Sequence, residues 1–176
     1  MRVCILGSGL SGLTLAKALV NEKIYVDLYC SNNNKKINKS RTLGISKSNF
    51  DFFNSNIVKI EKIIWKLKKI EIFSENLKNE KILNFQNHKD QLFSIIKNFE
   101  LYSILQNRLL NNKYFNKIKI NKKFKDFDHY NLIINTEYSN IFTRKHFNKK
   151  IVKNYKSYAF TTIIKHEKIS NDIATQ

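Results

Sequence analysis

Hydrophobic positions near the N-terminus follow two different periods. Val3–Leu6 is a continuous apolar run, which is typical of a buried strand. Helical spacing follows at Leu13, Ala16, Leu19 and Val20. Ile24–Tyr29 then alternates between apolar and polar positions, as a second strand does. The pattern therefore predicts a strand, a helix and a second strand, the βαβ arrangement of an α/β fold.

The next apolar positions predict two helices. The segment Arg41–Ser46 leads into the first, for which Ser46 or Ser48 provides a cap. Its apolar side carries Phe50, Phe53 and Ile57. A second helical pattern runs through Ile60, Ile63, Ile64 and Leu67, with Trp65 close by. Because the aromatic residues here recur at helical spacing, we interpret them as core residues and not as a stacking platform.

Strand patterns dominate the remainder of the chain. Ile70–Phe73 and Lys81–Phe85 flank a polar turn and predict a hairpin, whereas Phe93–Ile96 fits either a strand or the start of a helix. A helix is predicted over Glu100–Asn112, and strands are predicted around Ile118 and Ile120, over Tyr130–Ile134 and over Tyr155–Lys165. Tyr130–Ile134 stops at Asn135-Thr136-Glu137, where an open α/β sheet places ligand-contacting loops.

Three of the 4 glycines lie in one short stretch, Gly7-Ser8-Gly9-Leu10-Ser11-Gly12, between the first predicted strand and helix. In this context Gly7 allows a tight turn, Gly9 lets a pyrophosphate approach the backbone, and Gly12 lets helix and strand pack closely. The helix N-terminus would face the phosphates. The spacing indicates a dinucleotide site, and the alternative is a glycine-rich turn in an ordinary βα unit.

The chain is strongly basic, with 32 Lys and Arg against 14 Asp and Glu, a net charge of +18 and a pI near 9.9. Such a charge attracts nucleic acid or an anionic membrane surface. Lys, Asn, Ile, Phe and Tyr are all heavily used, as AT-rich codons would dictate. We favour this compositional explanation, with weak membrane-surface attraction as a by-product and nucleic acid as the less favoured partner.

Other chemistry has little support in the 176 residues. No apolar run is long enough for a membrane-spanning helix, and Lys17 interrupts any resemblance to a signal peptide. Cys4 and Cys30 have no metal-ligand pattern around them, which indicates a reducing compartment and no metal site. The 4 histidines are scattered, so no catalytic side chain is nominated.

The ordered set of features resembles the FAD-dependent aromatic hydroxylases, a family of monooxygenases, and particularly their ubiquinone-biosynthesis branch. After the glycine turn, Arg41–Ser46 is similar to the arginine segment that approaches the flavin nucleotide. The similarity continues at Trp65, Ile70-Glu71-Ile72, Ser94–Leu101, Tyr130–Asn140, Arg144 and Tyr155–Gln176. It covers essentially the whole chain but about the first half of a family member, so a truncated or split enzyme is expected.

The resemblance implies a fold and a division of the chain. The fold is α/β, with a Rossmann-like FAD-binding βαβ domain into which the beginning of a β-sheet substrate domain is inserted. Residues 1–66 and 91–145 would form the FAD-binding domain, and residues 67–90 and 146–176 the partial substrate-domain sheet. The expected location is cytoplasmic, at most peripheral to the inner membrane surface.

The resemblance also implies an activity and a site. Family members use NAD(P)H to reduce FAD and then hydroxylate an aromatic ring with oxygen; here the substrate would be a quinone precursor. The implied cofactor-binding residues are Gly7, Ser8, Gly9, Leu10, Ser11, Gly12, Arg41 and Glu137. A C-terminal partner chain could supply the missing half. Whether this chain is an enzyme stays open, because a catalytically inactive FAD-binding or dinucleotide-binding remnant is the alternative.

Three positions depart from the family pattern. Cys30 occupies the place of the acidic residue that holds the ribose hydroxyls. Asn135-Thr136-Glu137-Tyr138 stands where Gly-Ala-Asp-Gly is usual, so Glu137 keeps a carboxylate while two glycines are lost. Lys97-Asn98 replaces the commoner Glu-Asn. Cys30 thus weakens the adenosine end of the expected site, and Asn135 and Tyr138 stand where backbone clearance is wanted.

Overall fold

The computed structural model describes residues 1–30, 38–74, 80–86, 91–120, 127–138, 140–146, 151–160, 162–164, 167 and 172–176. The chain divides into two compact units, which we describe separately. The first comprises Met1–Ile37 and Tyr102–Phe160, and the second comprises Asn38–Leu101 and Thr161–Gln176. The predicted division at residues 66, 91 and 145 stays a prediction.

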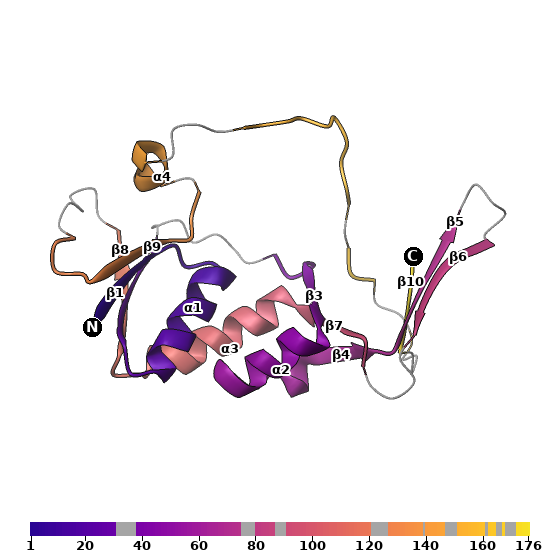
Figure 1. Cartoon of the computed structure of the whole chain (residues 1–176), viewed down its shortest axis with the longest axis horizontal. Helices are drawn as coiled ribbons and strands as arrows, with labels where there is room; N and C mark the ends of the chain where they lie inside the picture. Colours follow the sequence, from indigo (N-terminus) through magenta and orange to yellow (C-terminus); the bar gives the residue numbers. More distant parts are fainter. Residues whose placement is uncertain are drawn as a thin grey trace. The chain divides into compact units, whose positions relative to one another are not determined.

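The first unit is built on a four-stranded parallel sheet (Figure 1). Its strand order is β8 (Phe115–Lys119), β2 (Tyr25–Cys30), β1 (Arg2–Leu6) and β9 (Leu132–Asn135). The central strands β1 and β2 are apolar and buried after their first residues, as expected of parallel strands covered on both faces. This arrangement confirms the α/β fold class and the predicted strand–helix–strand beginning of the chain.

The two faces of this sheet bury different sets of residues. Cys4, Leu6 and Tyr29 form one cluster, against which Phe127 and Phe142 pack. Val3, Ile5, Val26 and Leu28 alternate with that set and are also buried. Helix α1 (Leu10–Asn21) buries Leu13, Ala16 and Val20, and α3 (Asn98–Leu110), which belongs to this unit from Tyr102 on, buries Leu105 and Leu109. The helical spacing of the sequence thus marks core-facing residues. Helix α4 (Ile141–His146) follows β9.

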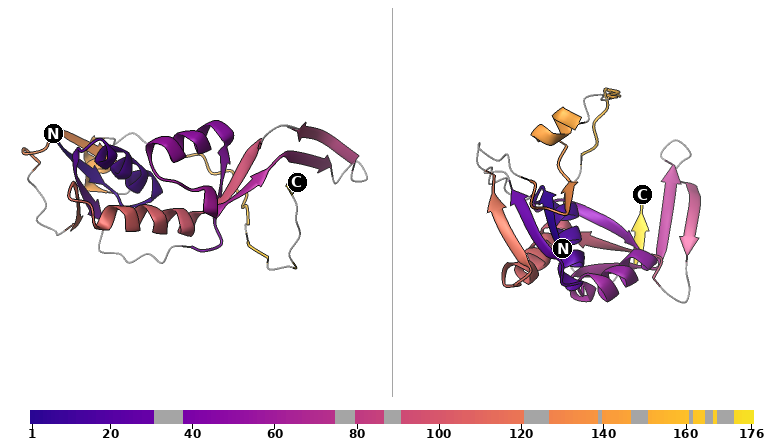
Figure 2. Two further views of the ribbon diagram at one scale, coloured as in Figure 1. Left: turned by 90° about the horizontal axis from the view of Figure 1, so that it is seen from below. Right: turned by 60° about the vertical axis from the view of Figure 1, so that its left-hand side comes forward.

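The second unit contains two small sheets (Figure 2). In one, β7 (Phe93–Lys97) lies between β3 (Thr42–Ser46) and β4 (Ile64–Leu67), antiparallel to both. In the other, β5 (Lys69–Ser74) pairs antiparallel with β6 (Glu80–Gln86) and parallel with β10 (Ile173–Thr175). The predicted hairpin is confirmed. Helix α2 (Lys47–Asn56) begins at its predicted cap, where Ser46 accepts a hydrogen bond from the Asn49 N–H.

The helix predicted over Ile60–Leu67 is wrong. A single 3₁₀ turn, η1 (Glu61–Ile63), leads directly into β4, and Trp65 is 47% exposed instead of buried. The apolar positions satisfy helical spacing, but Ile64 and Leu67 pair with Ile96 and Phe93 of β7. Pairing with a strand distant in sequence therefore overrides the local pattern. Phe50, by contrast, is buried as predicted.

The long strand predicted over Tyr155–Lys165 is also wrong for the part that the structure describes. Residues 155–160 and 162–164 have neither helix nor strand, and the next strand along the sequence is the short β10 (Ile173–Thr175). The alternation of apolar residues is real, but a strand forms only where a neighbour satisfies its backbone N–H and C=O groups. The described residues supply no such neighbour for this segment.

Within the same described residues, no helix has the length and apolarity needed to cross a membrane.

Candidate functional site: a glycine turn between strand and helix

Gly7 makes the sharp turn that leaves the first strand. Its φ of +111° lies in a region that residues with a side chain rarely adopt. Its N–H donates to the carbonyl of Tyr29, at 2.9 Å, which holds the turn against β2. A side chain at this position would also crowd Thr136 and Glu137. The predicted tight turn at Gly7 is therefore confirmed.

Gly12 and Gly9 have opposite surroundings. A Cβ on Gly12 would collide with the carbonyl oxygen of Gly7, so only glycine allows α1 to pack this closely on the turn. A Cβ on Gly9 would meet nothing within 4 Å. Gly9 is exposed and caps the N-terminus of α1 with extended backbone (φ −73°, ψ 180°). Backbone conformation and close packing explain why Gly7 and Gly12 must be glycine, whereas Gly9 borders open space.

The N-terminus of α1 lies beside that open space. Backbone N–H groups of a helix's first turn lack partners within the helix and carry partial positive charge, which suits an anion. Leu10 and Ser11 belong to this turn, and Ser11 is exposed. No acidic residue lies in the first turn of α1 to oppose an anion. The geometry is suited to a phosphate group.

The end of β9 contacts the glycine turn. Leu6 and Asn135 are paired in register, so the residues that follow β1 and β9 emerge at the same edge of the sheet. The Thr136 hydroxyl donates to the carbonyl of Leu6 at 2.9 Å and to that of Gly7 at 3.2 Å. Glu137, half-buried, follows directly. The structure thus brings the predicted residue Glu137 beside Gly7.

Asn135 fixes the loop that follows β9. Its side-chain amide donates to the hydroxyl of Thr143 at 2.7 Å, and its carbonyl oxygen accepts from Asn140 at 2.6 Å. Thr143 also donates to the carbonyl of Glu137, at 2.9 Å. Among the described residues, the non-glycine residues with positive φ are Lys23 and Lys156. Asn135 and Tyr138 therefore adopt ordinary backbone where the resemblance expects glycine.

The remaining candidates are Cys30 at the end of β2, Arg41 in the second unit and Arg144 in α4. Cys30 ends β2, is buried, and donates its thiol to the carbonyl of Ile118 at 3.5 Å. Arg41 precedes β3 in the second unit, is exposed, and accepts a hydrogen bond from the Asn98 N–H on its backbone carbonyl. Arg144 lies in α4 and is exposed. The structure gathers the glycines and Glu137 within one unit, and Arg41 belongs to the other.

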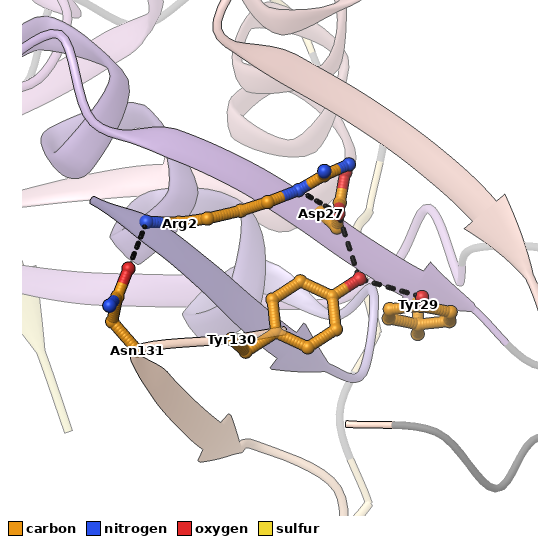
Figure 3. Close-up of polar contacts among 5 residues, drawn as sticks. All are labelled: Arg2, Asp27, Tyr29, Tyr130 and Asn131. Carbon is orange, nitrogen blue, oxygen red and sulfur yellow. Dashed lines mark hydrogen bonds and ion pairs between the residues drawn. The ribbon is translucent and has the colours of Figure 1, made fainter. Parts of the chain in front are cut away.

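A polar cluster around the buried Asp27 of the first unit was not predicted from the sequence (Figure 3). Asp27, in the middle of β2, accepts hydrogen bonds on one carboxylate oxygen from the Arg2 guanidinium at 2.8 Å and the Tyr130 hydroxyl at 2.7 Å. Because Tyr130 donates its only hydroxyl proton to Asp27, Tyr29 donates to Tyr130 across 2.7 Å. Asn131 accepts from the backbone N–H of Arg2. An aspartate inside an otherwise apolar strand was the available signal.

Tyr130→Phe is expected to lower the free energy of unfolding by about 1–2 kcal/mol at pH 7, because two partly buried hydrogen bonds are lost. Burial and its hydrogen bonds with Tyr29 and Asp27 raise the pKa of Tyr130, so the folded state holds its proton where the unfolded state releases it. Wild-type stability should therefore fall above a pH of about 10, where an unfolded tyrosine ionises. Chemical denaturation between neutral and alkaline pH should show a smaller fall for Tyr130→Phe, and an identical fall would contradict this assignment.

Among the residues that the structure describes, other reactive side chains are not grouped into a site. Burial raises the pKa of the Cys4 thiol to about 12, which makes it a poor nucleophile. His129 lies against the Tyr130 ring, with 4.0 Å between ring centroids. His88 and His166 lie outside the described residues. In the part of the chain that the structure describes, no group of three His, Cys, Asp or Glu is placed to hold a metal ion.

Solved structures of flavin-dependent monooxygenases share this fold. PqsL from Pseudomonas aeruginosa, a probable FAD-dependent monooxygenase, matches 88% of this chain and 48% of its own with a TM-score of 0.66 at 10% identity. The p-nitrophenol 4-monooxygenase PnpA from Pseudomonas putida DLL-E4 matches 66% of this chain and 31% of its own, with a TM-score of 0.55 at 12% identity. The flavin-dependent monooxygenase PieE, solved with FAD and substrate, matches 68% of this chain and 24% of its own, with a TM-score of 0.53 at 13% identity.

These comparisons show which fold the chain shares and how much of each neighbour it spans. At such identities they establish that the chain folds like part of an FAD-dependent monooxygenase, which agrees with the family resemblance at that level. The chain spans 24% to 48% of the length of these three structures. No protein-family model and no curated protein sequence matches the chain.

Proposed function

We propose that the first unit binds FAD through the glycine turn and the N-terminus of α1. The observation that carries the proposal is the contrast between the three glycines. Gly7 and Gly12 are required by the fold, whereas Gly9 borders open space at a helix N-terminus. A pyrophosphate needs this combination of close backbone approach and unpaired N–H groups. The fold shared with FAD-dependent monooxygenases supports FAD over other dinucleotides.

The chain's own residues would hold the cofactor rather than react with it. Backbone N–H groups at Gly9, Leu10 and Ser11 would bind the pyrophosphate, and Ser8 and Glu137 border the same turn. Arg41, which the resemblance implies as a further cofactor contact, stays a prediction. Bound FAD would supply the oxygen chemistry, since flavin carries electrons that side chains cannot.

We extend the proposal to a substrate class. By its resemblance to the ubiquinone-biosynthesis branch, the chain would take part in hydroxylating an aromatic quinone precursor, with NAD(P)H as the reductant. The fold neighbours that act on aromatic compounds include a p-nitrophenol monooxygenase. Because the chain spans at most 48% of these three neighbours, further polypeptide would be needed to complete the substrate site, as a continuation or as a partner chain.

A second candidate function is a dinucleotide-binding protein without turnover. Cys30 favours it, because a buried thiol bonded to Ile118 stands where a carboxylate would accept the ribose hydroxyls. Binding of the pyrophosphate does not require that carboxylate, but adenosine binding is weakened without it. The two candidates therefore share a binding site and differ in chemistry.

Flavin titrations test the binding proposal. FAD should bind saturably, with a change in its absorption spectrum, and ADP should compete with it because ADP carries the same pyrophosphate. Riboflavin, which lacks the pyrophosphate, should neither bind measurably nor compete. Riboflavin binding as tight as that of FAD, or no FAD binding with or without further polypeptide, would overturn the proposal. NAD(P)H-dependent hydroxylation of a quinone-precursor phenol would then exclude the second candidate.

A further inference from the structure

The segment Ile151–Phe160 presents large apolar side chains to solvent. Ile151, Tyr158 and Phe160 are 101%, 85% and 94% exposed, and Val152 and Tyr155 are 70% and 75% exposed. Scattered exposed apolar residues are ordinary, but a run of them in one short segment marks an interaction surface. The segment has neither helix nor strand.

The charge around this segment is of one sign. Between Glu137 and Glu167 the sequence contains no acidic residue. The same stretch contains Arg144, Lys145, Lys149, Lys150, Lys153, Lys156 and Lys165. Lys153 and Lys156 lie inside the exposed apolar segment, and the ammonium of Lys153 lies 5.1 Å from the centre of the Tyr155 ring. Cationic and aromatic groups are therefore presented together.

We propose that Ile151–Phe160 is a docking surface for an anionic lipid membrane. Lysines near such a surface are attracted to the anionic headgroups, and their aliphatic stems can lie along the apolar boundary. Tyrosine rings suit the interface because one end is apolar and the other hydrogen-bonds to water. The net charge of +18 adds long-range attraction of the same sign. The proposal is independent of flavin binding.

The aliphatic residues favour lipid over nucleic acid. Aromatic rings with interleaved lysines could also stack on the bases of a single strand. Ile151 and Val152, however, have no π-face on which a base could stack, yet they are among the exposed residues of the segment. Transfer of such side chains into an apolar boundary is favourable. A lipid surface therefore uses the aliphatic, aromatic and cationic side chains of the segment together.

Vesicle co-sedimentation tests the proposal with the full chain. Binding is expected to vesicles of phosphatidylcholine with phosphatidylglycerol, to be weak with phosphatidylcholine alone, and to fall with added salt. Lys153→Gln with Lys156→Gln should weaken partitioning by about 25-fold, at about fivefold per lysine. Tyr158→Ser with Phe160→Ser should weaken it by about tenfold. Lys59→Gln with Lys62→Gln, and Phe52→Ser, change exposed residues outside the segment and should weaken partitioning by less than about twofold.

Three outcomes would overturn the proposal. One is equal loss of vesicle binding in the control variants, which would mean that bulk charge and not the segment is responsible. Another is unchanged vesicle binding in the segment variants, with weaker binding of a fluorescent single-stranded oligonucleotide. The third is self-association, measured by ultracentrifugation without vesicles, that disappears in Tyr158→Ser with Phe160→Ser while vesicle binding persists.

A fluorescent reporter separates insertion from loose adsorption. Trp65 is the only tryptophan and lies outside the segment, so Trp65→Phe with Tyr158→Trp places the single indole within it. Anionic vesicles should shift the emission of this variant to shorter wavelength, because the indole leaves water. An unshifted emission at saturating lipid would overturn the proposal. Circular dichroism of each variant checks that the fold is retained.

Discussion

Gly12→Ala is expected to lower the free energy of unfolding by about 3 kcal/mol and to abolish FAD binding. The added methyl group would clash with the Gly7 carbonyl oxygen, which is backbone and cannot move aside as a flexible side chain can. Helix α1 must therefore shift away from β1, and the shift also opens the turn that Gly7 makes. Denaturation followed by circular dichroism and an FAD titration measure the two effects.

Gly9→Ala is the matched control for this prediction. Its methyl group would meet nothing within 4 Å, and the φ of −73° suits alanine. The cost in unfolding free energy should be at most about 1 kcal/mol, since glycine is only a moderately better helix cap than alanine. FAD affinity should nevertheless fall, because the methyl group stands where the pyrophosphate would approach. A large loss of stability in Gly9→Ala, or none in Gly12→Ala, would contradict the steric roles assigned here.

The fold was predictable where local pattern and tertiary structure agree. The apolar run Val3–Leu6 forms the buried strand β1, and the apolar run predicted over Tyr130–Ile134 forms β9 from Leu132 onward, at the edge of the same parallel sheet. β4 is different because Ile64–Leu67 satisfies a helical period locally. Its structure is decided by β7, nearly 30 positions later in the sequence. The segment Tyr155–Lys165 has a strand pattern but no strand in the part described, because pattern alone cannot supply a pairing neighbour.

The candidate site likewise combines local features, which the sequence shows, with contacts between residues far apart in the sequence. The glycine spacing is a local feature of the sequence, so the turn at Gly7 and the close packing at Gly12 could be predicted. Thr136 was not singled out, because its bonds to Leu6 and Gly7 join residues about 130 positions apart. Asp27 likewise depends on partners 25 and 103 positions away. Contacts of this range become visible only once the strand order is known.

Arg2→Met should lower the free energy of unfolding by about 2–3 kcal/mol, the second large effect. The Asp27 side chain is only 4% exposed, and Arg2 is its ion-pair partner at 2.8 Å. Removing the guanidinium leaves a buried carboxylate supported by the Tyr130 hydroxyl, and an unpaired buried charge is costly. The Arg2 side chain is 51% exposed, so the loss should stay below that of a fully buried pair.

Asp27→Asn separates the charge from the hydrogen bonds. Alone it should cost about 1 kcal/mol, because the amide keeps the shape and still accepts from Tyr130. Combined with Arg2→Met it should recover most of the loss caused by Arg2→Met alone, since no buried charge is then left without a partner. Lys47→Met removes the exposed Lys47–Asp51 pair and should cost at most about 0.5 kcal/mol. Additive losses in the double variant would mean that Arg2 stabilises the sheet through packing and not through its charge.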